Sequence, residues 1–314
     1  MLKITNFDSY IGQNNIKKTI NMMIKSSEIQ NKTLLDHILI CGLAGTGKTT
    51  LAKIIGNMQN KKTHFAQGSL LEKKSDIVTL FSNIQEGDII FIDEIHSINK
   101  NVEELLYTIM EEFKIDVMLG SGTNSKIIRI KVKPFTLIGA TTKVYNLSNP
   151  LKERFGFIAK MQAYTLENIK DIIKMHAYNL QQNVTENVLE FIAQFSRLNP
   201  RIIINLFNRI VDFSIVKSQN EITIDLVKKA LKTMGIHKYG FSEEHIEYLK
   251  CFKDFGNSRF MSLDFISGIT NFNKEDILSE IEPILLSYNL IQKTSKGRKI
   301  TQLGERYLLE CNNY

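Results

Sequence analysis

The first half of the chain alternates short runs of apolar residues with longer stretches in which apolar positions recur at helical spacing. The clearest runs are residues 36–41, 88–93 and 135–140, each rich in isoleucine, leucine or phenylalanine. Strands that are apolar along almost their whole length are typical of a parallel sheet covered by helices on both faces. The pattern therefore predicts an α/β domain in the first half of the chain.

Past about Tyr164 the strand pattern gives way to amphipathic helices. Apolar residues recur every three or four positions over 166–181, 185–197, 200–217 and 224–234. Gly235 is suited to end the last of these helices, because glycine accepts the left-handed backbone conformation found at helix ends. Four short helices in succession predict a small helical domain.

A third pattern begins near Lys238. Helical spacing extends over 243–255, 262–269 and 274–288, and two short runs at 290–294 and 298–301 flank the turn signal Ser295-Lys296-Gly297. Three helices followed by a hairpin are typical of a winged-helix domain. The chain is thus predicted to divide into a large α/β domain at 1–164, a helical domain at 165–237 and a winged-helix domain at 238–314.

Composition narrows the class of protein. The chain has 314 residues, of which 43% are hydrophobic and 23% charged, as in soluble globular proteins. It has neither the roughly 18-residue apolar stretch of a membrane span nor an apolar signal-peptide core at its start. Cys41, Cys251 and Cys311 are scattered, which argues against disulfides or zinc and favours a bacterial cytoplasm. The net charge of +7 suits a nucleic-acid partner, although an AT-rich genome equally explains the many lysines.

One glycine-rich segment has a phosphate-binding pattern. Gly42-Leu43-Ala44-Gly45-Thr46-Gly47-Lys48-Thr49 matches G-x-x-x-x-G-K-[ST], follows a predicted strand and precedes a predicted helix. In such loops backbone N–H groups and the helix N-terminus converge on phosphate oxygens. We expect Lys48 to reach the β and γ phosphates of ATP and Thr49 to offer its hydroxyl to Mg²⁺. The other residues expected to bind the nucleotide here are Gly42, Gly45, Thr46, Gly47 and Thr50.

Two carboxylates follow the next apolar run. Asp93 and Glu94 come directly after residues 89–92. Asp93 is expected to bind Mg²⁺ together with Thr49, directly or through water, and Glu94 to polarise the attacking water. A kinase has no reason to activate water, so the pair favours an ATP hydrolase. The nearby His96 is either a group that couples this site to a partner or a packing residue.

Several segments, taken together, resemble the RuvB family of AAA+ ATPases. They are residues 7–13, 93–96, 113–116, 135–142, 150–156, 199–202 and 294–298, so the resemblance covers essentially the whole chain. It implies an AAA+ P-loop core with a helical lid and a C-terminal winged helix. It also implies an ATP-driven homo-oligomeric ring, hexameric on DNA, that pumps duplex DNA to branch-migrate Holliday junctions in recombination and repair.

The resemblance assigns further roles. Thr141, preferred to its neighbour Thr142, resembles the polar group that senses the γ-phosphate. Arg154 resembles an arginine finger, which a neighbouring subunit delivers to the transferring phosphoryl group. Arg201 resembles the lid arginine that touches phosphate in the same subunit. The residues that match the segments beside the adenine are Tyr10, Ile11 and Tyr164.

A predicted hairpin lies between the carboxylates and the third strand. Residues 114–119 and 128–132 alternate apolar and polar positions, and a glycine-containing segment at 120–125 separates them. In the RuvB family the corresponding hairpin, here 113–133, docks the junction-binding partner RuvA. Leu119 and Ile127 near the tip would then form a contact patch. The alternative is an edge hairpin packed on the main sheet.

The predicted wing contains a local cluster of basic residues. Lys293, Lys296, Arg298 and Lys299 lie close together in the sequence and are suited to sequence-independent contacts with DNA phosphates. Arg298 is the preferred DNA-binding residue among them. The alternative is a solvated loop without a function.

Two rival functions share part of this pattern. A clamp-loader ATPase has a similar core but ends in a helical collar, which the wing signal disfavours. A DNA-binding initiator or regulator would use ATP mainly as a switch. A ring subunit that cannot hydrolyse ATP is disfavoured because Lys48, Asp93, Glu94 and Arg154 are all present.

Overall fold

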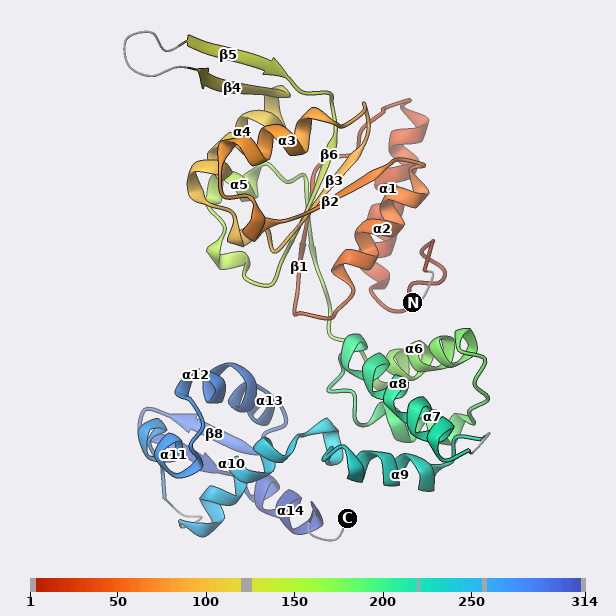
Figure 1. Cartoon of the computed structure of the whole chain (residues 1–314), viewed down its shortest axis with the longest axis vertical. Coiled ribbons are helices and arrows are strands. Elements are labelled where there is room, and N and C mark those ends of the chain that lie inside the picture. The colour runs from red at the N-terminus through yellow and green to blue at the C-terminus, as the bar shows by residue number, and fades with distance from the viewer. Residues whose placement is uncertain (1–3, 120–125, 219–220, 256–258, 312–314) are drawn as a thin grey trace. The chain divides into compact units, whose positions relative to one another are not determined.

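The computed structural model describes residues 4–119, 126–218, 221–255 and 259–311. The chain divides into two compact units. The first unit comprises Met1–Ile172 with Asn199–Arg201, and the second comprises Ile173–Leu198 with Ile202–Tyr314. Figure 1 labels their elements. None of the helices in the described ranges combines the length and apolar character that a bilayer crossing requires.

A five-stranded parallel sheet forms the centre of the first unit, in the order β2-β3-β6-β1-β7. Its strands are β1 Ile38–Cys41, β2 Thr63–Gln67, β3 Ile89–Asp93, β6 Thr136–Thr141 and β7 Phe157–Lys160. The three inner strands are almost wholly buried, and they are the ones that the apolar runs predict. The pattern misses the edge strands β2 and β7, because they are partly exposed and have no continuous apolar run.

Helices cover both faces of this sheet (Figure 1). They are α1 Asn14–Ile29, α2 Lys48–Met58, α3 Lys74–Ser82 and α4 Lys100–Glu112. Ile38 and Ile40 of β1 belong to the core formed with α1 and α2, whereas Leu39 belongs to the core formed with α3 and α4. Successive side chains of a strand point to opposite faces, so one apolar run serves both cores. The predicted α/β domain is confirmed, and the carboxyl ends of β1, β3 and β6 meet at one edge.

The predicted hairpin is present and directly follows α4. Its strands, β4 Lys114–Leu119 and β5 Lys126–Lys131, pair antiparallel and form a two-stranded sheet of their own rather than extending the central sheet (Figure 1). Ile128 and Ile130 of β5 are exposed. The side chains of the two expected contact residues, Leu119 and Ile127, lie outside the described part of the chain.

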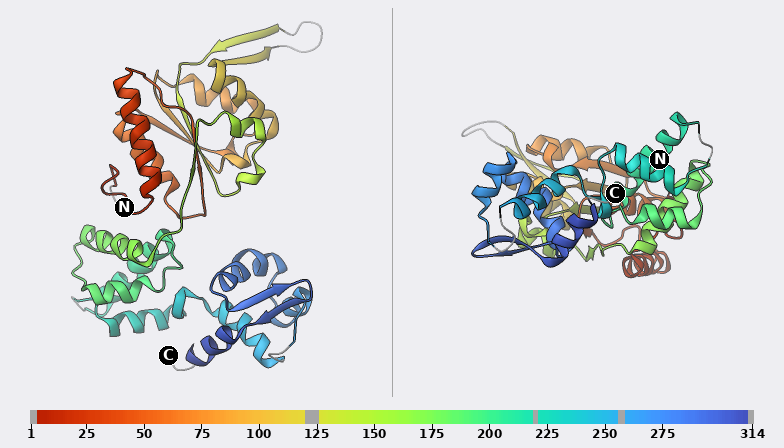
Figure 2. Two further views of the ribbon diagram at one scale, coloured as in Figure 1. Left: turned by 180° about the vertical axis from the view of Figure 1, so that it is seen from behind. Right: turned by 90° about the horizontal axis from the view of Figure 1, so that it is seen from below.

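The four predicted lid helices are present as α6 Leu166–Asn179, α7 Glu186–Ala193, α8 Pro200–Val216 and α9 Ile224–Thr233. Gly235 follows the C-cap of α9 with a φ of 62°, as expected for a glycine that ends a helix. The winged-helix elements follow in the same unit, and Figure 2 shows them from two further directions. They are α10 Glu243–Asp254, α11 Leu263–Thr270, α12 Lys274–Asp276, a π-helical segment Ile277–Ile281, α13 Glu282–Ser287, β8 Ile291–Thr294, β9 Gly297–Ile300 and α14 Gln302–Cys311.

Two features of the winged-helix domain depart from the predicted pattern. The third helix widens into a π-turn before Pro283, which has no N–H to donate and crowds the preceding turn. A further helix, α14, follows the hairpin and was not predicted; it contains Gly304. A Cβ at Gly304 would lie 2.3 Å from the carbonyl oxygen of Leu290, so glycine there permits close packing of α14.

Candidate active site

The glycine-rich loop joins the end of β1 to the start of α2, as its motif requires. Gly45 and Gly47 have positive φ angles of 79° and 94°, a region that favours glycine. A Cβ on Gly45 would lie 2.4 Å from Asn199 Oδ1, and one on Gly47 would lie 2.8 Å from the Tyr10 hydroxyl. Glycine is therefore needed at both positions, and the loop can turn its N–H groups toward an anion at the start of α2.

Lys48 is buried beneath this loop. Its Nζ donates to the carbonyl oxygens of Gly42 at 2.9 Å and Leu43 at 3.0 Å. Burial lowers the pKa of Lys48, while the nearby carboxylates of Glu94 and Asp93 oppose that shift. An ammonium group has three donors, so one remains available for an anionic ligand in addition to the two carbonyl bonds.

The two predicted carboxylates stand at the end of β3, beside the loop. The Thr49 hydroxyl donates to Asp93 Oδ2 at 3.2 Å, which places the two expected metal ligands together. Glu94 has a φ of 46°, and non-glycine residues rarely adopt this left-handed conformation. Such strain is often retained at functional sites because it directs a side chain. Here it turns the chain so that the Glu94 side chain faces the end of β6.

The end of β6 supplies two threonines with different surroundings. The Thr142 hydroxyl donates to Glu94 Oε2 at 3.0 Å. Thr141 is fully buried, and its Oγ lies 2.9 Å from Nδ1 of His96 and accepts the N–H of Lys143 at 2.9 Å. His96 Nδ1 is also 3.1 Å from Glu94 Oε2. The hydroxyl that contacts Glu94, the carboxylate expected to activate water, is therefore that of Thr142, whereas the family resemblance favoured Thr141.

Two buried tyrosines brace the loop from the core. The Tyr10 hydroxyl donates to the Gly47 carbonyl oxygen at 3.2 Å, and the Tyr164 hydroxyl donates to that of Thr46 at 3.0 Å. Burial raises the pKa of Tyr10 well above its ordinary value and also raises that of Tyr164. Both hydroxyls therefore stay protonated and can hold the loop. The other predicted contacts, Ile11 and Thr50, are half-buried.

The segment Asn199–Arg201 belongs to the same compact unit as the loop. Asn199 Nδ2 donates to the Ala44 carbonyl oxygen at 2.9 Å, and its Oδ1 accepts the N–H of Arg201 at 3.0 Å. The positive charge of Arg201 is close enough to help lower the pKa of Lys48, although burial lowers it more. Arg201 therefore lies by the phosphate loop. Asn199 was not predicted to have a role, because an asparagine before proline looks like an ordinary helix start.

Arg154 is not part of this cluster. It follows the short helix α5 Asn149–Glu153 and lines a cavity of about 630 Å³ together with Asp36, His37 and Phe113. Asp36 and His37 precede β1, whereas the phosphate loop follows it. The fold therefore places Arg154 toward the amino end of β1 and the phosphate loop at its carboxyl end. The predicted catalytic residues that the fold brings together are Lys48, Asp93, Glu94 and Thr141.

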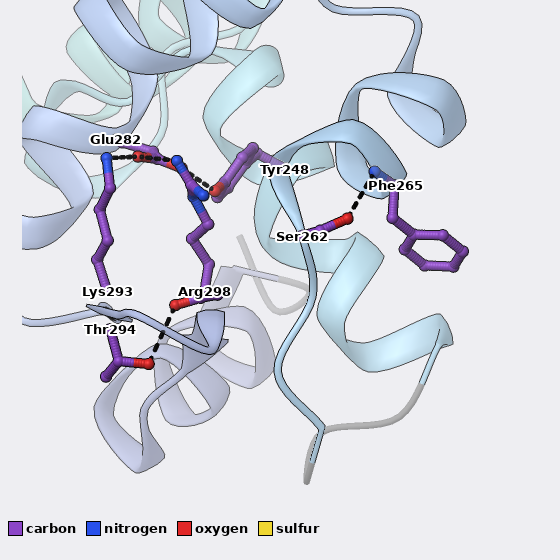
Figure 3. Close-up of polar contacts among 8 residues, drawn as sticks. Tyr248, Ser262, Phe265, Glu282, Lys293, Thr294 and Arg298 are labelled. Atoms are coloured by element: carbon purple, nitrogen blue, oxygen red, sulfur yellow. Dashed lines mark hydrogen bonds and ion pairs between the residues drawn. The ribbon is translucent and has the colours of Figure 1, made fainter.

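One buried carboxylate organises the wing (Figure 3). Glu282 is 1% exposed and accepts hydrogen bonds from Arg298 Nε at 2.6 Å, Lys293 Nζ at 2.9 Å and the Tyr248 hydroxyl at 2.9 Å. Burial raises the pKa of Glu282, but the hydrogen bonds from these three groups outweigh it and lower the pKa overall. The carboxylate therefore stays ionised and holds β8 and β9 against α13 and α10.

The four predicted DNA-binding residues fall into two pairs as a result. Arg298, with 12% of its side chain exposed, and Lys293 are bound to Glu282. Lys296 is exposed in the turn, and the Lys299 ammonium lies 5.9 Å from the centre of the Phe260 ring. The choice of Arg298 as the main phosphate contact does not fit this geometry, because its guanidinium already neutralises a buried carboxylate. Lys296 and Lys299 are the better candidates.

Family models for three consecutive parts of RuvB match the chain. The model of the Holliday junction DNA helicase RuvB P-loop domain matches residues 2–161. The model of the RuvB AAA lid domain matches 164–237, and that of the RuvB C-terminal winged helix domain matches 238–309.

Named relatives match over nearly their full length. The Holliday junction branch migration complex subunit RuvB of Mycoplasmopsis pulmonis is 48% identical over 303 residues, which cover 96% of each chain. The subunit of the same name from Mesomycoplasma hyopneumoniae is 44% identical over 309 residues, which cover 98% of this chain and 97% of the relative.

Solved structures of Thermotoga maritima RuvB are similar to the whole chain. The one named as a Holliday junction branch migration motor has a TM-score of 0.81 at 34% identity, with 97% of both chains covered. Other structures contain single replacements of an alanine, a proline, a threonine, a lysine or an arginine. This chain has the same five residue types at the same spacing along its sequence. In the order just given, they are Ala140, Pro200, Thr142, Lys48 and Arg154. By this spacing, the threonine replaced there corresponds to Thr142.

Proposed function

Since this chain belongs to the RuvB family, we propose that it is the ATP-hydrolysing motor that drives branch migration of Holliday junctions. The observation that supports this most strongly is the union, in one chain, of a hydrolytic P-loop site with the RuvB lid and winged helix over residues 2–309. A clamp loader has a helical collar after its lid, whereas residues 238–309 of this chain match a winged helix domain. The motor works in the bacterial cytoplasm during recombination and repair.

The residues around the glycine-rich loop fit ATP with Mg²⁺. The loop N–H groups and Lys48 bind the β and γ phosphates, and exposed Arg201 reaches the same phosphates from the start of α8. The Thr49 hydroxyl and the Asp93 carboxylate, already 3.2 Å apart, are oxygen ligands of the kind Mg²⁺ prefers. Mg²⁺, when bound, neutralises phosphate charge. The residues proposed to border the adenine are Tyr10, Ile11 and Tyr164, two of which also hold the loop.

Hydrolysis depends on a water activated at the end of β3. Glu94 polarises this water, and the Thr142 hydroxyl, which donates to Glu94 Oε2, orients the carboxylate and senses the γ-phosphate. Thr141 supports the arrangement from the core through its contact with His96, which in turn lies 3.1 Å from Glu94. Thr142 thus takes the role that the sequence assigned to its neighbour.

Arg154 acts on the nucleotide of a neighbouring subunit. Its position away from the phosphate loop of its own chain is what a residue supplied in trans requires. A guanidinium placed on the transferring phosphoryl group stabilises the transition state and is worth roughly 10³-fold or more in rate. The functional assembly is accordingly a homo-oligomeric ring, hexameric on DNA, in which each site is completed by the next subunit.

Two surfaces connect the ring to its partners. The hairpin 113–133 docks a RuvA-like junction-binding protein, and the exposed Ile128 and Ile130 supply apolar contact area. Lys296 and Lys299 of the wing contact phosphates of double-stranded DNA without reading its sequence. Lys293 and Arg298 set the shape of the wing through Glu282.

The proposal is tested by ATP-dependent dissociation of a synthetic four-way junction, with and without a RuvA-like partner. We expect the wild-type chain with its partner to convert the junction into duplex products. Glu94→Gln removes the carboxylate that activates water, and Arg154→Ala removes the positive charge that a neighbouring subunit supplies. Each should lower kcat for ATP by about 10²-fold or more. ATP hydrolysis by the wild-type chain without any junction dissociation, even with the partner, would contradict the motor assignment.

A further inference from the structure

The helix that carries Arg154 is clamped to α4 at both of its ends. Glu103, Tyr107 and Glu111 follow one another at intervals of four residues, so they line one face of α4. The helix α5, whose N-cap is Ser148 and whose C-cap is Arg154, contacts α4. None of these α4 residues belongs to the phosphate site described above.

A buried carboxylate anchors the start of α5. Ser148 is the N-cap of α5, and its Oγ accepts the N–H of Leu151 at 3.3 Å. The Ser148 hydroxyl also contacts Glu103 Oε1, and the Tyr107 hydroxyl donates to the same oxygen at 2.9 Å. The Tyr107 and Ser148 hydroxyls also lie 2.7 Å apart, so without the buried Glu103 one could donate to the other, but one of the two would lose its acceptor. The start of α5 is therefore fixed to α4 by a closed group of three side chains.

An aromatic ring and an ion pair hold the other end. The Arg154 guanidinium lies over the Tyr107 ring, 4.8 Å from its centre. Its NH2 is 3.1 Å from Glu111 Oε1, and its NH1 donates to the Pro150 carbonyl oxygen at 2.8 Å. Arg154 Nε is buried and has no hydrogen-bond partner among the described residues. The same tyrosine thus touches both the anchor of α5 and the guanidinium at its end.

We propose that Glu103 and Tyr107 are positioning residues that hold the guanidinium of Arg154 in place for the neighbouring subunit. The proposal rests on the proposed function, in which Arg154 acts in trans. Tyr107 is the platform that fixes the guanidinium by cation–π contact, and Glu103 fixes the start of α5 through the Ser148 hydroxyl. Glu111 is 57% exposed and holds the guanidinium only until a phosphoryl group takes its place. A long arginine side chain without such a platform samples many rotamers, and a misplacement of about 1 Å can cost roughly 100-fold in rate.

The first test compares variants of α4 in DNA-stimulated ATP hydrolysis by the full chain. Tyr107→Leu removes the platform and should lower kcat by about tenfold while leaving KM for ATP nearly unchanged, since only transition-state contacts are lost. Tyr107→Phe keeps the ring and should stay within about threefold of the wild type. Glu104→Gln, at an exposed position on the same helix, is the control and should stay equally close, because surface substitutions usually have little effect. Thermal unfolding of each variant verifies that it is folded.

The second test separates a trans defect from a local one by mixing subunits. Glu94→Gln chains lack their own activity but retain Arg154 and its platform. Suppose that rings assemble at random from equal amounts of Glu94→Gln and Tyr107→Leu chains. About a quarter of the sites then combine a subunit that keeps Glu94 with a neighbour that keeps Tyr107. ATP hydrolysis should therefore recover to about a quarter of the wild-type rate. Equal amounts of Glu94→Gln and Arg154→Ala chains should recover to the same level.

The outcomes distinguish this inference from the proposed function. In one outcome the mixture with Arg154→Ala recovers ATP hydrolysis, but the mixture with Tyr107→Leu hydrolyses ATP only at the average rate of its two components. Tyr107 then acts within its own subunit and the inference is wrong. A loss in Tyr107→Phe as large as that in Tyr107→Leu would also overturn it, because the ring would not be the platform. If neither mixture recovers, Arg154 does not act in trans, and that part of the proposed function fails with it.

Discussion

The threonines at the end of β6 differ in what their hydroxyl groups touch, and this difference predicts different consequences of replacing them. Thr142→Val keeps the shape but removes the donor to Glu94 Oε2. We expect kcat for ATP to fall by about 10- to 100-fold with little change in KM, since loss of one well-placed donor has effects of this order. The measurement is steady-state ATP hydrolysis in the presence of duplex DNA.

Thr141→Val is the natural comparison, because it removes a hydroxyl from the adjacent residue. Thr141 is fully buried and accepts the N–H of Lys143, so its loss should appear mainly as a stability cost of about 1–3 kcal/mol in denaturant unfolding. If Thr141→Val abolished hydrolysis in a stable chain while Thr142→Val remained active, Thr141 would be the γ-phosphate sensor after all.

These threonines also show how far the sequence predicts a site. The residues Lys48, Asp93 and Glu94 were predictable because a phosphate loop and a strand ending in carboxylates are local patterns. The choice between Thr141 and Thr142 depends on where β6 ends and which way each side chain points. Both are set by pairing with β1 and by His96, which is distant in sequence. The sequence therefore predicts a polar group at the end of β6 but does not decide between the two threonines.

At the scale of elements, the wing owes its conformation to the ion pairs of Glu282. Glu282→Gln removes the negative charge that neutralises Arg298 and Lys293, and loss of one partner of a buried pair costs about 3 kcal/mol or more. We expect a lower Tm for the winged-helix transition in calorimetry at neutral pH. Glu275→Gln, at an exposed position on the same helical stretch, should leave Tm unchanged.

The pH dependence of this effect follows from the direction of the pKa shift. The pKa of Glu282 is lower in the folded chain than in the unfolded chain, so its contribution is present above the ordinary glutamate range and is lost as pH falls through the lowered value. The Tm difference between wild type and Glu282→Gln should therefore shrink in acid. A difference that stayed constant down to the acid transition would mean that charge on Glu282 does not stabilise the wing.

Elements were predictable where burial is uniform and were missed where it is mixed. The inner strands and the amphipathic lid helices have clear apolar periods, whereas the edge strands β2 and β7 consist mostly of partly buried and exposed residues. Counting charges in the wing correctly identified a basic cluster. It could not show that Lys293 and Arg298 are neutralised. Their partner Glu282 lies on α13, outside the wing, and only folding brings it next to them.

At the scale of the whole molecule, one of the points where the chain passes between the two compact units lies between Leu198 and Asn199. Arg197 and Leu198 have φ angles of 50° and 54°, an uncommon pair of left-handed residues. Arg197 Nε donates to the Gly240 carbonyl oxygen at 2.7 Å within the second unit. Asn199 Nδ2 donates to the Ala44 carbonyl oxygen within the first. A strained two-residue segment thus separates a contact to the phosphate loop from a contact to the start of the winged-helix domain.

This arrangement predicts that Asn199 couples hydrolysis to DNA movement. Asn199→Ala removes one hydrogen bond to the loop, worth about 1 kcal/mol, so ATP hydrolysis should stay within about fivefold of wild type. Four-way junction dissociation should fall further, by more than tenfold, because changes at the loop no longer act directly on the segment that enters the second unit. Gln194→Ala, exposed at the end of α7, serves as the control and should leave both rates unchanged. If dissociation and hydrolysis fell in parallel in Asn199→Ala, the residue would serve only the nucleotide site, and the coupling would have to pass through the rest of the lid.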